Sequence, residues 1–351
     1  MTAIDSLATK DSACALADNL STATDSLAIA ATDHPLAILD TLEVTMKGGS
    51  TLLNIALALV MFGVALGIKP RTFLDIIKNP KSILTGIVCQ ILLLPALTLL
   101  LIIACGDLLS PMVALGMILV ACCPGGNVSN FITSLSRGNS ELSVSLTAFN
   151  TAVCIFTTPA NFAIWGKLYL KFAGNHSMNL PELQIPFPEI FQSIVIIMGI
   201  PLILGILCSQ YYPKIAEKLT KPLQKLSIVV FIAMVVIIFT GNVDVFMACI
   251  KYIFLIVLVQ NLLALGIGYG TSTLLKLPYK DRRTVTIETG IQNSGLGLAL
   301  LLNDKIFDPI LWANNGGMLV ITAWWGVWHI ISGLTLAYLW RWKGRKEPNE
   351  Q

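Results

Sequence analysis

Two short polar stretches interrupt otherwise apolar parts of this sequence. The first, residues 123–130, reads CPGGNVSN, and the second, residues 288–295, reads ETGIQNSG. Hydrocarbon offers no water to an unpaired backbone group or carboxylate, so polar breaks inside a membrane span persist only where protein or a bound ligand satisfies them. If their flanking segments cross a membrane, the two stretches predict a binding site near the middle of the bilayer.

Glu288 has the most distinctive chemistry in these stretches. Apolar residues flank it on both sides, whereas the other acidic residues lie in the N-terminal segment, in loops or at the ends of spans. Burying an unpaired carboxylate in a span costs at least ~2.5–3.5 kcal/mol, and no apolar segment contains an interior lysine or arginine that could pair with it. The carboxyl group therefore requires a bound metal cation or a transferable proton.

Neutral oxygen atoms are the other candidate ligands. Hydroxyl and amide side chains occur in several spans: Ser129, Asn130, Ser143, Thr147, Gln90 and Gln292. Ser143 and Thr147 are four residues apart and therefore lie on one helical face. One carboxylate among neutral oxygens suits a weakly bound monovalent cation better than Ca²⁺, which usually recruits several carboxylates. Na⁺ is the natural candidate, and opened glycine turns also free backbone carbonyls such as those of Thr289 and Ile291 as ligands.

The composition places these residues in a membrane. Of the 351 residues, 55% are hydrophobic and only 12% are charged, which cannot cover a soluble surface with polar atoms. The lipid bilayer is therefore the expected environment, and no basic stripe indicates nucleic acid. The eight cysteines fall mostly inside apolar segments and show no metal-ligand spacing.

Apolar windows of about 20 residues predict an all-α membrane protein with nine transmembrane helices. A tenth would arise if the last window were divided at Gly316-Gly317, or if a span were hidden in the N-terminal segment. The windows lie near residues 50–68, 83–105, 111–136, 141–166, 187–208, 225–247, 252–275, 284–302 and 311–340.

Basic residues give this arrangement an orientation. Most of the 23 lysines and arginines fall on one side, in the stretches 69–81, 214–225, 276–283 and 341–346. The positive-inside rule therefore places the C-terminal tail, residues 342–351, in the cytoplasm and the N-terminus outside. Residues 1–46 read as a polar, acidic, extracytoplasmic tail, disordered or lying on the surface. Residues 47–341 form the membrane domain.

The two polar stretches fall in the third and eighth spans, which run in opposite directions. Matched discontinuous helices in two halves of a chain are typical of an inverted-repeat secondary transporter. Other glycines in the spans, Gly63, Gly67, Gly266 and Gly270, are interpreted as sites where helices approach closely.

Three stretches resemble motifs of the bile acid:sodium symporter family: CCPGGNVSN, RGNSELSVSLT and RRTVTIETGIQNSGL. The resemblance extends from about residue 50 to residue 340. The resemblance implies an inverted repeat with a core domain, near 83–166 and 252–340, and a panel domain, near 50–68 and 187–247. It also implies sodium-coupled symport of an organic anion, bile acid-like or a small carboxylate, by alternating access, with the substrate in a crevice between the two domains.

The resemblance further implies two sodium ions per cycle. One would be held by Ser129, Asn130, Ser143, Thr147 and Glu288, and the other by Gln90, Glu288, Gln292 and the carbonyls of Thr289 and Ile291. Gln90 is matched through its position five residues before Pro95. Substrate contacts would come from Asn127, Asn293 and His329.

The sequence just after the last of these residues departs from the family pattern. Many bacterial relatives read Trp-His-Asn where this chain has Trp328-His329-Ile330, so an amide that could hold a carboxylate is missing. His329 has an equal alternative as a packed helix residue bonded to a neighbouring carbonyl.

Two rival functions remain open from the residues alone. A proton-coupled carrier on the same scaffold would use Glu288 as a titrating group, and an ion channel would line a continuous pore with the same oxygens. An enzyme is not expected, because the sequence contains neither a His-Glu-x-x-His helix nor a Gly-x-Ser-x-Gly elbow.

Overall fold

The protein's structure is a computed structural model that describes residues 36, 39, 50–67, 80–174, 191–192, 195–240, 243–302 and 315–346. Within these ranges the secondary structure is helical without strands, and the one β-type contact is an isolated bridge between Gly125 and Gln292. Of the predicted N-terminal tail only Leu36 and Leu39 are described, and both are buried in the apolar core. The rest of the tail, and the starts of the windows 187–208 and 311–340, lie outside the described residues.

The first half of the chain contains one long interrupted helix and one broken helix. Its elements are α3 (Ser50–Leu66), α5 (Pro80–Val88), the π-helical turn η1 (Cys89–Leu93), α6 (Leu94–Cys105), the short η2 (Gly106–Leu108), α7 (Pro111–Cys122), α8 (Val128–Leu135) and α9 (Ser140–Gly174). Pro95 has no N–H to bond the carbonyl of Ile91 four residues earlier. Asn161 of α9 donates to that carbonyl instead, at 3.0 Å, which ties the turn carrying Gln90 to α9.

The second half repeats the broken-helix pattern. Its elements are η3 (Val195–Gly199), α11 (Ile200–Tyr211), α12 (Pro213–Thr240), α13 (Val243–Leu274), α14 (Tyr279–Gly290), α15 (Ser294–Leu301) and α16 (Gly316–Lys346). The boundary predicted between residues 247 and 252 is wrong, because α13 begins at Val243 and continues through Lys251. Lys251, which falls between the two predicted windows, is an exposed residue within α13, and a long lysine side chain can extend its charge toward water. The boundary instead lies between Thr240, the last residue of α12, and Val243.

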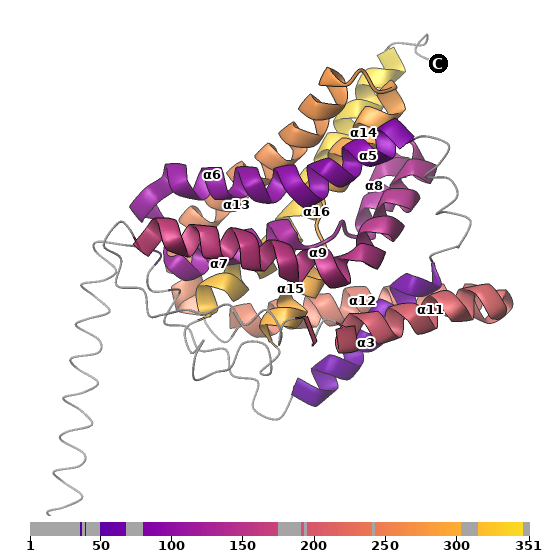
Figure 1. Cartoon of the computed structure of the whole chain (residues 1–351), viewed down its shortest axis with the longest axis horizontal. Helices are drawn as coiled ribbons and strands as arrows, with labels where there is room; N and C mark the ends of the chain where they lie inside the picture. The colour runs from indigo at the N-terminus through magenta and orange to yellow at the C-terminus, as the bar shows by residue number, and fades with distance from the viewer. Residues whose placement is uncertain are drawn as a thin grey trace, which may run out of the picture.

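The helices form two groups (Figure 1). In one, α3 packs against both α11 and α12, along one side of the molecule. In the other, α13 packs on α14, α7 packs on α16 and on α9, and α15 packs on α16. Contacts of α12 with α16 and of α15 with α3 join the groups.

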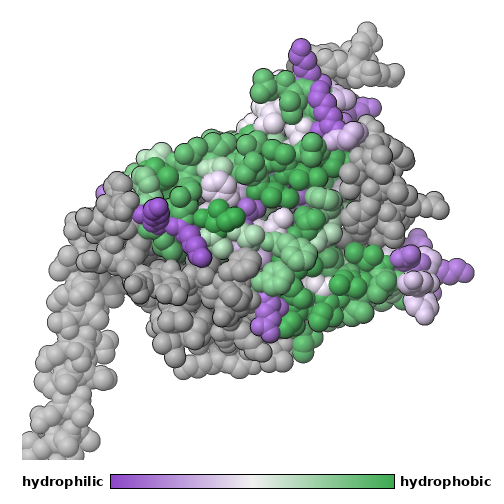
Figure 2. Space-filling model, in the orientation of Figure 1, coloured by the Kyte–Doolittle hydropathy of each residue, from purple (hydrophilic) through white to green (hydrophobic). Residues whose placement is uncertain are grey.

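Several helices have the length and apolar composition needed to cross a membrane. Four stretches in the described ranges are long and apolar enough to cross one: Pro80–Leu108, Ser140–Ala173, Phe246–Leu274 and Gly316–Trp342. Figure 2 shows a broadly hydrophobic face with hydrophilic residues gathered toward its margins. Large apolar side chains such as Leu84, Phe131 and Leu255 are exposed there or elsewhere on the surface, as expected of a protein solvated by lipid.

Only one of the four glycines interpreted as close-approach sites lies at a helix contact, and Gly67 has only the carbonyl of Val64, from the end of α3 that precedes it, within 4 Å. A methyl group on Gly63 would lie 2.6 Å from Cβ of Leu223 in α12, so this glycine does allow close helix packing. A methyl group on Gly266 or Gly270 would meet nothing within 4 Å. The interpretation of Gly266 and Gly270 as close-approach sites is therefore wrong, because both are exposed on α13 and the close approach to α14 is at Gly268 between them, where a methyl group would lie 2.7 Å from Cα of Thr286.

Candidate functional site

Both polar stretches break their helices, as the sequence predicts, and the breaks cross each other. The N–H of Gly126 donates to the carbonyl of Ile291 at 2.9 Å, and the N–H of Asn293 donates to the carbonyl of Pro124 at 2.8 Å. The unwound segments thus satisfy each other's backbone groups, which hydrocarbon could not do. This arrangement brings the ends of α7, α8, α14 and α15 to one place.

Glycine is needed at the crossing because side-chain and backbone atoms of the opposite segment lie so close. A methyl group on Gly125 would lie 2.5 Å from Oε1 of Glu288, and one on Gly126 would lie 2.9 Å from the carbonyl oxygen of Gln292. Real Cβ atoms do not approach other heavy atoms this closely. The two glycines therefore set the distance between the crossing segments and admit the carboxylate beside them.

Glu288 lies at the centre of a cluster of neutral oxygens and is only 1% exposed. Ser129 Oγ donates to its Oε2 at 2.6 Å, and Thr147 Oγ1 donates to its Oε1 at 2.7 Å. Ser143 Oγ donates to Oε2 at 3.3 Å, and Asn130 Oδ1 lies 3.3 Å from the Thr147 hydroxyl. The structure therefore brings together all five residues of the first predicted sodium set.

The charge of this cluster has no basic partner in the part of the chain that the structure describes. Among the residues that the structure describes, Glu288 is bonded to three hydroxyl groups and to no lysine or arginine. It also lies in the last turn of α14, where the helix dipole is negative and disfavours a carboxylate. Hydroxyl oxygens keep lone pairs that can face a metal ion, so carboxylate, hydroxyl and amide oxygens together fit a hard monovalent cation.

The second predicted sodium set forms a hydrogen-bonded amide pair next to this cluster. Gln90 Nε2 donates to Gln292 Oε1 at 2.6 Å and to the carbonyl of Cys123 at 2.9 Å. Gln292 Nε2 in turn donates to the carbonyl of Thr289 at 2.7 Å, and the carbonyl of Ile291 accepts the crossing bond described above. These groups are together, but a cation could bind them only if the two amides turned their oxygens toward it.

The predicted substrate residues are brought together only in part. Asn127 and Asn293 occupy the N-cap positions of α8 and α15, on either side of the crossing, and each is half-buried. The Asn293 side chain accepts from the N–H of Leu296 at 3.1 Å. His329 of α16 is buried, and its Nδ1 has no hydrogen-bond partner among the described residues, so no hydrogen bond joins it to either asparagine.

Sequence reasoning missed two buried amides of α13 that donate hydrogen bonds to the broken helices α14 and α7. Asn261 of α13 donates from Nδ2 to the carbonyl of Gly290 at 2.8 Å, and Ser332 of α16 donates to Asn261 Oδ1 at 2.5 Å. The neighbouring Gln260 donates to the carbonyl of Met117 in α7 at 3.0 Å. Two adjacent amides inside an apolar window were the available signal, of the same kind that pointed to Gln90.

Removing the Asn261 amide should loosen the broken end of α14. We expect Asn261→Ala to lower the free energy of unfolding by about 1–3 kcal/mol, because it leaves the buried carbonyl of Gly290 without a donor. Chemical unfolding of the purified protein measures the change. Gln210→Ala, which removes an exposed amide from α11, is the matched control, and equal effects of the two substitutions would contradict the assigned bond.

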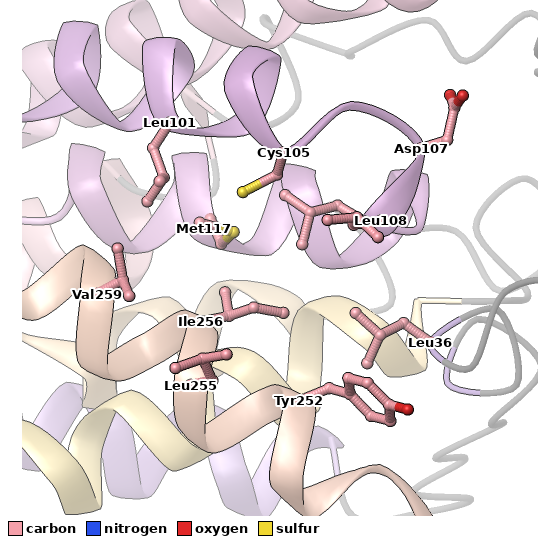
Figure 3. A pocket seen from close by; sticks show the side chains of 11 residues that line it. Leu36, Leu101, Cys105, Asp107, Leu108, Met117, Tyr252, Leu255, Ile256 and Val259 are labelled. Atoms are coloured by element: carbon pink, nitrogen blue, oxygen red, sulfur yellow. The ribbon is translucent and has the colours of Figure 1, made fainter.

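An apolar cavity of about 610 Å³ lies away from the crossing, between the end of α6, α7 and α13 (Figure 3). Leu101, Met117 and Ile256 line it, and the carboxylate of Asp107 points away from it (Figure 3). None of the predicted cation or substrate residues lines this cavity. The predicted cation ligands therefore lie at the crossing and not at this cavity.

Broken helices that cross around a buried carboxylate, among apolar helices of spanning length, define a multi-pass membrane transport protein. Comparison with known sequences agrees, because the profile of the Sodium Bile acid symporter family matches residues 54–249. The chain belongs to this family. It is therefore a transporter and not an enzyme, as the sequence predicts.

The relatives extend this similarity beyond the matched profile. The sodium-dependent transporter YocS of Bacillus subtilis (strain 168) is 30% identical over 85% of this chain and 85% of its own length. The ileal sodium/bile acid cotransporter of Homo sapiens is 30% identical over 70% of this chain and 68% of its length. A probable sodium/metabolite cotransporter, BASS2 of Oryza sativa subsp. japonica chloroplasts, is 27% identical over 84% of this chain and 64% of its length.

Proposed function

We propose that this protein couples the inward movement of Na⁺ to the symport of an organic anion, by alternating access. The observation that carries the proposal is the carboxylate of Glu288, buried at the crossing and bonded to three hydroxyl groups. A carboxylate in this setting attracts a cation, and the surrounding oxygens can replace part of its hydration shell. The names of the relatives, which pair sodium with bile acid or metabolite, support the same coupling.

Helix ends of both polarities meet at the crossing. α7 and α14 end there, at Cys122 and Gly290, and their negative dipole ends favour cations. α8 and α15 begin there, just after Asn127 and Asn293, and their positive ends favour an anion. We place sodium on the Glu288 side and the substrate anion at the two asparagines, with His329 as a further contact and the Gln90–Gln292 amides as the second sodium position.

Coupling follows if bound sodium holds the parts of the crossing together. The oxygens of the Glu288 cluster come from α8, α9 and α14, so an ion among them stabilises one arrangement of these helices. It also neutralises the carboxylate that would repel an anionic substrate. In this proposal α3, α11 and α12 form the panel, the remaining helices form the core, and the substrate crosses between them with the C-terminus in the cytoplasm.

Uptake into proteoliposomes tests this proposal. Thermal shift of the purified protein against steroid conjugates and small carboxylates, with and without Na⁺, selects the substrate, because a ligand that needs sodium should stabilise only when sodium is present. We expect accumulation of that anion to require an inward Na⁺ gradient and to stop when choline replaces Na⁺ at equal ionic strength. Uptake that persists in choline would contradict sodium coupling.

The same assay separates the rival functions. A proton-coupled carrier would give uptake driven by an imposed pH gradient in choline, and a channel would pass currents far above carrier turnover. The requirement for both Na⁺ and substrate in each transport event distinguishes symport from either alternative.

A further inference from the structure

A second buried carboxylate lies on the same helix as Glu288. Asp281 is 5% exposed and accepts hydrogen bonds from Ser82 Oγ at 2.6 Å, to Oδ2, and from Asn139 Nδ2 at 2.8 Å, to Oδ1. Its neighbour Arg283 is occupied elsewhere, because its guanidinium donates to the carbonyl of Ser136 at 2.6 Å. The described residues provide no lysine or arginine bonded to Asp281.

Three helix N-termini meet at this carboxylate. Ser82 lies in the first turn of α5, Asn139 immediately precedes α9, and Asp281 itself lies in the first turn of α14. The positive ends of helix dipoles stabilise a negative charge. The three helix ends and the two hydrogen bonds therefore favour a negative charge at Asp281.

The bonds of Asn139 extend this contact to the start of α9. Its Oδ1 accepts from the N–H of Leu142 at 3.1 Å, which caps α9, and its carbonyl accepts from the N–H of Ser143 at 3.1 Å. Its own N–H donates to Thr284 Oγ1 of α14 at 2.8 Å. The first turn of α9, which includes Ser143, is thus fixed to α14 through Asn139.

We propose that Asp281 is a positioning residue for the sodium site. Seven residues, or about two helical turns, separate it from Glu288 along α14, and Ser143 and Thr147 lie in the first two turns of α9. By holding Asn139, Asp281 fixes the start of α9 beside α14, so that the two hydroxyls reach the Glu288 carboxylate. This inference rests on the proposed function, because it assigns Asp281 an effect on sodium affinity.

Sodium titrations of thermal stability test the assignment, with choline keeping the ionic strength constant. We expect Asp281→Ala to raise the Na⁺ concentration for half-maximal stabilisation by about tenfold, as expected when a charge-assisted hydrogen bond is lost. Asp281→Asn, which is milder, should raise it by less. Exchanging the two groups, Asp281→Asn together with Asn139→Asp, restores a carboxylate–amide pair and should recover an affinity within about threefold of the original.

Two controls separate this proposal from a general loss of stability. Asp244→Asn, at an exposed aspartate in the first turn of α13, should leave the sodium titration unchanged. Variants of Asp281 should still reach full stabilisation at high Na⁺. An unchanged half-maximal concentration in Asp281→Ala, or an exchange variant no better than the singles, would overturn the positioning role. A wild-type protein insensitive to Na⁺ would instead refute the proposed function.

Discussion

Glu288→Gln should abolish sodium-dependent uptake while leaving the protein folded. Glutamine has nearly the same shape and can still bond the hydroxyls of Ser129 and Thr147, but it has no charge to hold a cation. A lost interaction of about 3 kcal/mol corresponds to about a hundredfold weaker binding, so we expect uptake driven by a Na⁺ gradient to fall at least that far. Initial rates in proteoliposomes, over a range of Na⁺ concentrations, measure the effect.

The control for this variant is Glu141→Gln, which neutralises an exposed glutamate at the start of α9. It changes the net charge by the same amount without touching the crossing, and its uptake should match that of the unmodified protein. A Glu288→Gln variant that keeps full sodium stimulation would remove the carboxylate from the mechanism. Uptake that loses its Na⁺ dependence but still follows pH would favour the proton-coupled alternative.

Gly125→Ala should also eliminate sodium-dependent uptake, for a steric reason. The added methyl group would lie 2.5 Å from Glu288 Oε1 and 3.1 Å from its Cδ. Either the carboxylate or the crossing segment must move, which separates Glu288 from its hydroxyl partners. Overpacking of this kind typically costs about 1–3 kcal/mol, so we expect both a lower unfolding temperature and the loss of stabilisation by Na⁺.

Gly266→Ala is the matched control, because a methyl group there meets nothing within 4 Å. Alanine also favours a helix interior over glycine. This variant should therefore transport normally and unfold at the same or a slightly higher temperature. If Gly125→Ala transported as well as Gly266→Ala, the close approach at the crossing would not matter for function.

The two broken helices and Glu288 could be predicted from residue types alone. Polar residues and glycines inside apolar windows are costly unless they are paired, so their presence identified the two breaks and Glu288 without any structure. The four-residue spacing of Ser143 and Thr147 likewise placed both hydroxyls on the face of α9 that meets the carboxylate. Residues that belong to one cluster through a single helix face can be recognised from spacing alone.

Contacts between distant helices could not be predicted in the same way. Asp281 was assigned to a span end, where an acid needs no explanation, and only the structure brings it against Ser82 and Asn139. The function of Asn261 depends on which carbonyl it faces, and spacing along α13 does not determine that. Lys251 and Gly266 show the opposite error, because a charge or a glycine on an exposed face of α13 gives the same sequence signal as one in a loop or a helix contact.

The two carboxylates of α14 show why position on a helix matters more than burial alone. Both accept hydrogen bonds from neutral donors only among the described residues, but Asp281 lies at the positive end of α14 and Glu288 at its negative end. We accordingly propose a positioning role for Asp281 and cation binding for Glu288.

Equilibrium binding of radioactive Na⁺ to the purified protein tests the central claim most directly. Wild-type protein should bind Na⁺ saturably, unlabelled Na⁺ should displace it and choline should not, and Glu288→Gln should show no binding at the same concentrations. Absence of saturable binding to the wild type, or equal binding by Glu288→Gln, would contradict the assignment of the Glu288 cluster as the sodium site.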